Sequence, residues 1–133
     1  MSNLVQKGNY VPVRRAGNSL FVSGHVSKNV AGKVGAGVTA EEAYRGAREA
    51  AEEVLRTLAA AGFAHEQVRA VKVLGFVNSA PDFTEQPSVV NGASDLFVER
   101  LGRDNGEHAR SAIGVAQLPR NAAVEIEAIF EVV

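Results

Sequence analysis

The last quarter of the chain holds the two stretches that decide the fold, Ser111-Ala112-Ile113-Gly114-Val115-Ala116 and Val124-Glu125-Ile126-Glu127-Ala128-Ile129-Phe130. In the first, small residues alternate with isoleucine and valine, and in the second, apolar residues alternate with glutamates. Both patterns are typical of β-strands. Between them lies Leu118-Pro119-Arg120-Asn121, which has the residues typical of a turn. We therefore expect two strands that form a hairpin.

A turn centred between Pro119 and Arg120 would place Ile113 opposite Ile126, with side chains alternating between the two faces of the sheet. One face would then form the core with the apolar residues Ile113, Val115, Val124, Ile126, Ala128, Phe130 and Val132. The other face would collect Arg110, Ala112, Gly114, Ala116, Glu125, Glu127, Ile129 and Glu131. Small residues, charges and one isoleucine are an unusual mixture for a solvent-exposed face, so we expect another subunit to cover it.

This register predicts that Arg110 and Glu125 share the second face, about four residues or ~13 Å apart along the strand. A small substrate and a water molecule could lie between their side chains. The pair is therefore a candidate active site. The same two residues are also compatible with a surface ion pair beside solvated glutamates, and the pattern alone leaves both interpretations open.

Upstream, the sequence predicts three further strands and two helices. Val11–Ala16 and Leu20–Val26 form strands around a Gly17-Asn18-Ser19 turn, and Pro12 favours an edge position because proline cannot donate to a ladder. Thr39-Ala40-Glu41-Glu42 has the form of a capping box and begins a helix that Gly62 ends.

Residues 66–78 are rich in valine and predict the next strand, and Pro87 begins a second helix that ends before Gly102. The order is therefore β-β-α-β-α-β-β. It predicts an α+β protein with one mixed sheet and two helices packed on one face, as a single domain over residues 1–133.

Composition excludes several classes of function. The chain has 133 residues and no cysteine, which rules out disulfides, thiolate nucleophiles, zinc fingers and iron–sulfur clusters. Its three histidines lack the spacing of metal ligands, so no metal is expected. A net charge of −1 gives no electrostatic reason to expect nucleic acid or an anionic membrane as a partner. No export signal or membrane-spanning stretch is evident, which predicts a cytoplasmic protein.

The C-terminal residues also resemble a known family. His108-Ala109-Arg110-Ser111-Ala112-Ile113-Gly114-Val115-Ala116-Gln117-Leu118-Pro119, continued by Ala123-Val124-Glu125-Ile126-Glu127-Ala128, is similar to the C-terminal signature of the YjgF/YER057c/UK114 family, also called the Rid (reactive intermediate deaminase) family. Gly17–Gly24 and the stretch from Phe76 to Asn91 add weaker matches. The resemblance implies a chorismate-mutase-like fold, a homotrimer, and ligand clefts between subunits.

In members of that family with deaminase activity, the arginine that matches Arg110 binds the substrate carboxylate and the glutamate that matches Glu125 activates water. Tyr10, Ser23, Asn91 and Ala112 match positions that line the same cleft. The resemblance thus implies an enamine/imine deaminase, a hydrolase of C=N bonds. It would convert small 2-imino acids to 2-oxo acids and ammonia without a cofactor.

Three departures from the family pattern bear on this expectation. Ala112 stands where the deaminases often have cysteine, His25 stands where glutamine is common, and Thr84–Pro87 resembles an insertion. Ala112 and the inserted loop support an alternative function, a non-catalytic trimeric protein that binds small carboxylate metabolites through the same Arg110. His25 and His108 flank the cleft positions and are candidates for substrate contact. Arg14-Arg15 is the only adjacent basic pair, which argues against the ribonuclease or translation-inhibitor activity described for some relatives.

Overall fold

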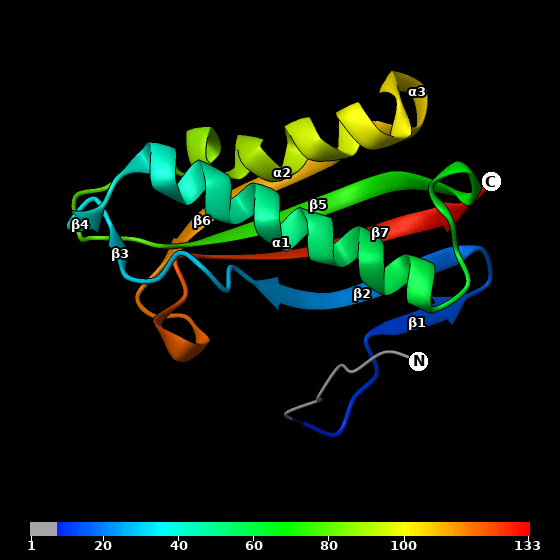
Figure 1. The fold of residues 1–133 in the computed structure, drawn as a ribbon, viewed down its shortest axis with the longest axis horizontal. Helices are drawn as coiled ribbons and strands as arrows, with labels where there is room; N and C mark the ends of the chain where they lie inside the picture. Colours follow the sequence, from blue (N-terminus) through cyan, green and yellow to red (C-terminus); the bar gives the residue numbers. More distant parts are fainter. Residues whose placement is uncertain (1–7) are drawn as a thin grey trace.

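The computed structural model describes residues 8–133, so most of the N-terminal stretch examined for an export signal lies outside the described residues. A five-stranded sheet in the order β1-β2-β7-β5-β6 organises the fold (Figure 1). The strands are β1 Val13–Ala16, β2 Ser19–Val26, β5 Val68–Asn78, β6 Ala109–Val115 and β7 Val124–Val132. Strand β5 pairs in parallel with β6 and antiparallel with β7, which confirms the mixed sheet. Strand β1, which follows Pro12, lies at one edge as predicted.

Two long helices, α1 (Ala40–Ala60) and α2 (Gln86–Leu101), cover one face of the sheet (Figure 1). The capping box of α1 is present, since Thr39 Oγ1 accepts from the backbone N–H of Glu42 at 3.0 Å and the Glu42 carboxylate accepts from that of Thr39 at 2.9 Å. The predicted α+β order is thus confirmed. The remaining elements are short: β3 Lys33–Val34, β4 Gly37–Val38, η1 His65–Gln67, α3 Arg103–Gly106 and η2 Pro119–Asn121.

The core lies between the helices and the sheet, and small residues let the two helices approach closely. Helix α1 buries four alanines, Ala43, Ala47, Ala50 and Ala51. On α2, a Cβ added at Gly92 would collide with the backbone carbonyl oxygen of Tyr44 on α1. The two helix backbones therefore meet at Gly92 with no space for a side chain.

Replacing Gly92 by alanine is expected to lower the free energy of unfolding by about 1–3 kcal/mol, because the new methyl group forces the helix backbones apart. Urea unfolding followed by circular dichroism measures the change. Ser88→Ala is the matched control, since Ser88 is exposed in the first turn of the same helix. If Gly92→Ala unfolded at the same urea concentration as the wild type, the two helices would be able to move apart slightly without loss of stability, and the prediction would be wrong.

The predicted terminal hairpin is wrong. Strand β5 lies between β6 and β7, so the two C-terminal strands do not pair with each other. A parallel β5–β6 pair requires a crossover connection, and helices α2 and α3 provide it. Residues 116–123 then carry the chain past the end of β5, where the Asn78 side chain donates to the carbonyl of Ala122 at 3.1 Å.

The change of neighbours also changes which side chains share a face. Arg110 lies opposite Val73 of β5, which is fully buried beneath the helices, so Arg110 is on the helix-covered face. Glu125 lies opposite Phe76, one position out of phase with the buried residues, and is on the other face. The expectation that Arg110 and Glu125 share a face is therefore wrong. Ile113 and Val115 are likewise not on the core side, and Ile113 is 42 % exposed.

The predicted core positions of β7 are confirmed, because Val124, Ile126, Ala128 and Phe130 are all buried against the helices. We use the term open face for the side of the sheet that the helices do not cover. Among the described residues, this face carries charged and apolar side chains together: Phe21, Lys72, Leu74, Phe76, Ile113, Glu125, Glu127 and Ile129.

Candidate functional site

Arg110 projects from the edge strand β6 toward helix α2. Its Nη1 donates to Oδ1 of Asn91 at 2.7 Å and to Oγ of Ser94 at 3.2 Å. Asn91 and Ser94 are three residues apart on α2, a spacing that places both on one helix face. Ala112, two residues farther along β6 on the same face, lies opposite Gly75 and packs partly buried against the core. We call Arg110, Asn91, Ser94 and Ala112 the arginine half-site.

The charge of Arg110 is not balanced by a carboxylate within the described part of the chain. Both of its hydrogen-bond acceptors are neutral, and no ion pair is formed by Arg110 among residues 8–133. Other arginines do pair with glutamates, namely Arg48, Arg56, Arg69, Arg100 and Arg103. A half-buried guanidinium that neutral groups hold in place suits a planar anion such as a carboxylate.

Glu125 lies on the open face of β7, beside a bulge in β2 formed by Ser23 and Gly24. A Cβ at Gly24 would collide with the Glu125 carboxylate, so the carboxylate lies directly against the backbone of Gly24. Burial raises the pKa of Glu125 above its usual range, and the negative charge of Glu127 raises it further. A carboxylate with a raised pKa is a stronger proton acceptor and is suited to general-base chemistry.

Tyr10 and Ser23 line one pocket on the open face together with Glu127, which is two residues from Glu125 on β7. The Ser23 hydroxyl donates to the carbonyl of Val11 at 2.7 Å, which ties the segment before β1 to the bulge. The Tyr10 side chain is half exposed, at 50 %. We call Glu125, Ser23 and Tyr10 the carboxylate half-site.

The structure thus divides the predicted site residues into two groups. Arg110, Asn91 and Ala112 come together at the β6 edge under α2. On the open face, Ser23 and Tyr10 line a pocket with Glu127, and Glu125 lies against Gly24 of the adjoining bulge. The sequence did not lead us to Ser94 as a site residue, although its spacing of three residues from Asn91 on a helix places the two side chains on one helix face. The role of His108 as the partner of Ser94 was also missed, because that contact joins two elements.

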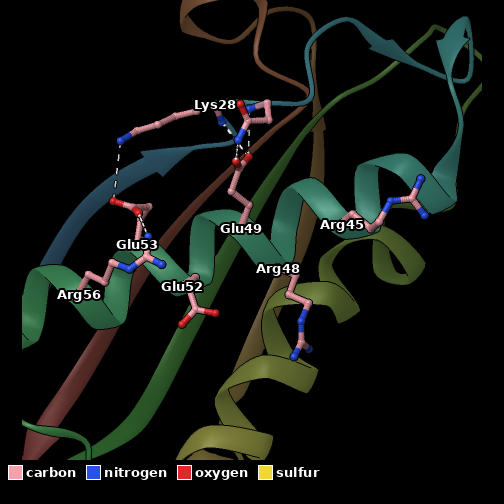
Figure 2. Close-up of a pocket in the computed structure, with 8 residues that line it drawn as sticks. Lys28, Arg45, Arg48, Glu49, Glu52, Glu53 and Arg56 are labelled. Carbon is pink, nitrogen blue, oxygen red and sulfur yellow. Dashed lines mark hydrogen bonds and ion pairs between the residues drawn. The ribbon is translucent and has the colours of Figure 1, made fainter.

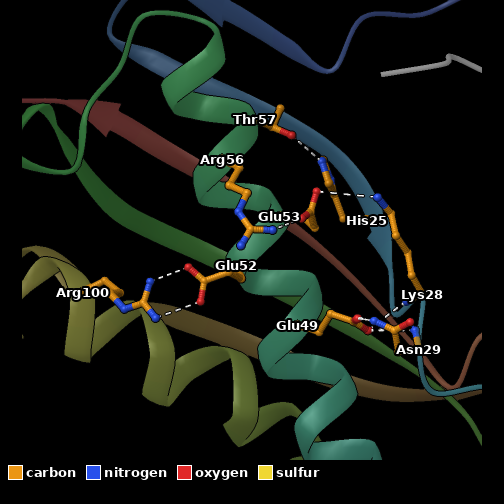
Figure 3. A network of polar contacts seen from close by, with 9 residues as sticks. All are labelled: His25, Lys28, Asn29, Glu49, Glu52, Glu53, Arg56, Thr57 and Arg100. Carbon is orange, nitrogen blue, oxygen red and sulfur yellow. Dashed lines mark hydrogen bonds and ion pairs between the residues drawn. The ribbon is translucent and has the colours of Figure 1, made fainter. Parts of the chain in front are cut away.

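The two histidines considered for substrate contact each have both ring nitrogens in hydrogen bonds. His25 contacts the carbonyl of Ser23 at 2.7 Å. Its other ring nitrogen contacts Oγ1 of Thr57 on α1, also at 2.7 Å (Figure 3). Burial lowers the pKa of His25, so its ring links β2 to α1 in the neutral form. Within residues 8–133, no group of three or more His, Cys, Asp or Glu side chains could hold a metal ion.

A second pocket lies along the outer face of α1 and is lined by charged side chains (Figure 2). Most of its charged side chains are engaged in contacts within the pocket or with α2. The Glu49 carboxylate accepts hydrogen bonds from the backbone N–H groups of Lys28 and Asn29, and the Lys28 side chain forms an ion pair with Glu53 at 3.7 Å. These contacts tie the loop after β2 to α1 (Figure 3), so we assign this pocket a structural role.

A mixed five-stranded sheet with two helices on one face defines a protein of the chorismate-mutase-like α+β class. Within that class, the family model described as Endoribonuclease L-PSP matches residues 1–132. The chain belongs to this family, which is the YjgF/RutC/UK114 family that the C-terminal signature resembles. The resemblance stated from the sequence is therefore confirmed.

Three relatives illustrate the range of the family. The chain is 46% identical to Protein TCP17 of Trypanosoma cruzi over 92% of this chain and 81% of that protein. It is 31% identical to a 2-iminobutanoate/2-iminopropanoate deaminase of Dermatophagoides farinae, over 92% of this chain and 84% of that protein. The crystal structure of Atu1372 from Agrobacterium tumefaciens, a protein of unknown function, superposes with a TM-score of 0.86 at 42% identity, covering 94% of this chain and 83% of the other.

In the part of the chain that the structure describes, none of the helices has the length and apolar character needed to cross a membrane.

Proposed function

We propose that this protein is an enamine/imine deaminase that hydrolyses small 2-imino acids to 2-oxo acids and ammonia. The observation that carries the proposal is Arg110, a half-buried guanidinium that neutral acceptors orient and that no carboxylate among residues 8–133 neutralises. Family membership and the related deaminase of Dermatophagoides farinae support the same chemistry. In this proposal the reaction takes place in the cytoplasm and needs neither a metal nor an organic cofactor.

The proposed mechanism uses one residue from each half-site. Arg110 binds the substrate carboxylate through paired N–H donors and so orients the adjacent imine carbon. Water adds to that carbon while Glu125 accepts a proton from the water. Glu125 then returns that proton to the nitrogen, which gives an intermediate with a hydroxyl and an amino group on the same carbon. Glu125 next transfers the hydroxyl proton to the nitrogen, the C–N bond breaks as the C=O bond forms, and ammonia leaves. The carbon that gained oxygen becomes the carbonyl of the 2-oxo acid.

One chain cannot bring the two residues to the same substrate, because Arg110 and Glu125 project from opposite faces of the sheet. We therefore propose a homotrimer in which the arginine half-site at the β6 edge of one protomer meets the carboxylate half-site on the open face of the next. The large apolar side chains on the open face support this assembly, because Phe21 and Ile113 are 45 % and 42 % exposed in the single chain. Burying such side chains favours association.

The direct test generates 2-iminobutanoate in solution with an amino-acid oxidase and measures ammonia and 2-oxobutanoate. The protein is expected to accelerate release over the rate in buffer. No acceleration with several imines would overturn the deaminase proposal. If 2-oxobutanoate nevertheless bound through Arg110, the result would favour the non-catalytic carboxylate-binding function. The same preparation incubated with RNA should leave it intact, because a net charge of −1 and the single adjacent basic pair Arg14-Arg15 give little electrostatic attraction for a polyanion.

Co-expressing Arg110→Ala chains with Glu125→Gln chains is expected to restore activity that neither variant has alone. In every cyclic trimer that contains both variants, about a third of the interfaces join two intact half-sites, so about a third of the wild-type activity should return. The measurement is kcat per site on purified mixed trimers that carry two different affinity tags.

The matched control co-expresses Arg110→Ala with Asn91→Ala. Both changes lie in the arginine half-site, so every site in a mixed trimer keeps one defect. Activity in the first mixture no higher than in this control would show that the site is not shared between chains.

A further inference from the structure

His108 precedes β6 and lies where α2, α3 and the start of the strand meet. Its ring packs edge-on against Phe97 of α2, with the ring centroids 6.0 Å apart. Nδ1 lies 2.6 Å from the carbonyl oxygen of Gly106, and Nε2 lies 2.9 Å from Oγ of Ser94. Both ring nitrogens are thus occupied by protein groups.

The partners of His108 determine where the protons lie. A carbonyl can only accept, so Nδ1 carries a proton and donates it to Gly106. In the neutral ring Nε2 is then an acceptor, and the Ser94 hydroxyl donates to it. The oxygen of Ser94 in turn accepts from Nη1 of Arg110 at 3.2 Å. Hydrogen bonds therefore run in one direction, from Arg110 through Ser94 to His108 and on to Gly106.

The far end of this chain of hydrogen bonds is fixed in position. A Cβ at Gly106 would lie 2.6 Å from the backbone carbonyl oxygen of Phe97 and 2.6 Å from the Cα of Val98. Helix α3 thus packs against the backbone of α2 at Gly106, which is buried. The carbonyl that orients His108 consequently has little freedom to move.

We propose that Ser94 and His108 are positioning residues that hold the Arg110 guanidinium in its carboxylate-binding orientation, and that they do so only while His108 is neutral. The inference rests on the proposed function, because it assigns to Arg110 the binding of a substrate carboxylate. It goes further by adding two residues and a pH dependence to that site. Asn91 holds the same nitrogen from the other side at 2.7 Å and does not titrate.

Protonation of His108 would break the arrangement. With a proton on Nε2 the ring can no longer accept from Ser94, and a second positive charge appears beside Arg110. The charged groups that act on the ring are Arg110 on β6 and Glu107, which follows α3. The side chains that reach it from α2, Ser94 and Phe97, carry no charge.

The pKa of His108 is lowered, chiefly by burial and further by the positive charge of Arg110. The neutral form therefore persists below the ordinary histidine range. Carboxylate binding is expected to be strong above this lowered pKa and to weaken as the pH falls through it.

The test measures the dissociation constant of 2-oxobutanoate by isothermal titration calorimetry between pH 4.5 and 8. At pH values below the lowered pKa of His108, the wild type is expected to bind about tenfold more weakly, because one hydrogen bond to a charged group is lost. His108→Gln keeps a neutral acceptor but cannot titrate, so its affinity should stay near the neutral-pH value throughout. His65→Gln is the matched control, because His65 is an exposed histidine in η1. It should show the wild-type profile.

Ser94→Ala removes the link itself and is expected to raise the dissociation constant about 5- to 10-fold at pH 8. Ser94→Thr keeps the hydroxyl and should restore binding. With imine substrate, Ser94→Ala should raise KM by a larger factor than it lowers kcat, because Ser94 acts on the substrate only through Arg110.

Three outcomes overturn the inference. A His108→Gln variant with the wild-type pH profile would show that another group titrates. A Ser94→Ala variant with wild-type affinity would show that Arg110 needs no support. Wild-type protein that binds no 2-oxobutanoate at any pH would overturn the inference together with the proposed carboxylate site. Normal binding and pH dependence without imine hydrolysis would leave the inference standing and would contradict the deaminase proposal alone.

Discussion

Replacing Arg110 by alanine is expected to lower kcat/KM for 2-imino acid hydrolysis by about 10²- to 10³-fold, which corresponds to about 3–4 kcal/mol of transition-state stabilisation. The reason is that a charge-assisted hydrogen bond contributes about 1.5–3 kcal/mol, and Arg110 is proposed to make two of them to the substrate carboxylate. Both KM and kcat should worsen, since the same contacts bind the substrate and orient its reacting carbon.

Arg110→Lys separates the contribution of charge from that of geometry. Lysine keeps the positive charge but lacks the planar fork, so it cannot bind Asn91, Ser94 and a carboxylate in one plane. We expect its kcat/KM to lie between those of the wild type and Arg110→Ala. Arg56→Ala is the matched control, because Arg56 lies on the exposed face of α1 in an ion pair with Glu53. An Arg110→Ala variant with activity equal to this control would contradict the assignment.

The second large effect is expected for Glu125→Gln, which should lower kcat by about 10²- to 10⁴-fold, the range typical of losing a general base. The amide has nearly the same shape but cannot accept a proton from water. Affinity for 2-oxobutanoate, which depends on the arginine half-site, should change little. Single-turnover kinetics on in situ generated imine would measure the chemical step directly.

The raised pKa of Glu125 also predicts how the reaction rate depends on pH. Glu125 can act as a base only when it is deprotonated. Because its pKa is raised, it becomes protonated and inactive at a higher pH than an ordinary glutamate. The rate should fall as the pH decreases through that raised pKa. Glu127→Gln removes the neighbouring negative charge and should move this fall to lower pH. A profile unaffected by Glu127→Gln would argue against Glu125 as the titrating base.

Glu131→Gln provides the control for the glutamate series. Glu131 lies on the same face of β7 but forms a surface ion pair with Arg69 at 2.8 Å. An exposed pair of this kind contributes only about 0–1 kcal/mol to stability. Its variant should therefore keep wild-type kcat and the wild-type pH profile, provided that sedimentation shows unchanged assembly.

Local patterns predicted the elements well because their causes are local. The capping box at Thr39 satisfies backbone donors within one turn of helix, and Pro87 acts within the first turn of α2. The alternation in Val124–Phe130 correctly placed the apolar residues of β7 against the helices, since side chains of any strand alternate between faces. Element order and fold class then followed from the sequence of these local signals.

Strand neighbours could not be predicted in the same way. The backbone groups of a strand can pair with any other strand, so alternation does not specify the partner. The hairpin prediction joined β6 to β7 because they are consecutive, whereas β5 offers partly buried Leu74 and Phe76 on one face and buried Val73 and Val77 on the other. A strand that is apolar on both faces is favoured at the centre of a sheet.

The sequence by itself determined the α+β class, the positions of the helices and most strands, and the candidate residues Arg110 and Glu125. Only the tertiary structure decided that these two residues lie on opposite faces, because the face of a side chain depends on the register with a strand distant in sequence. It also decided that Arg110 is supported by Ser94 and His108, which come from separate elements and meet through packing. Because the two residues lie on opposite faces, the proposed site takes Arg110 from one chain and Glu125 from another.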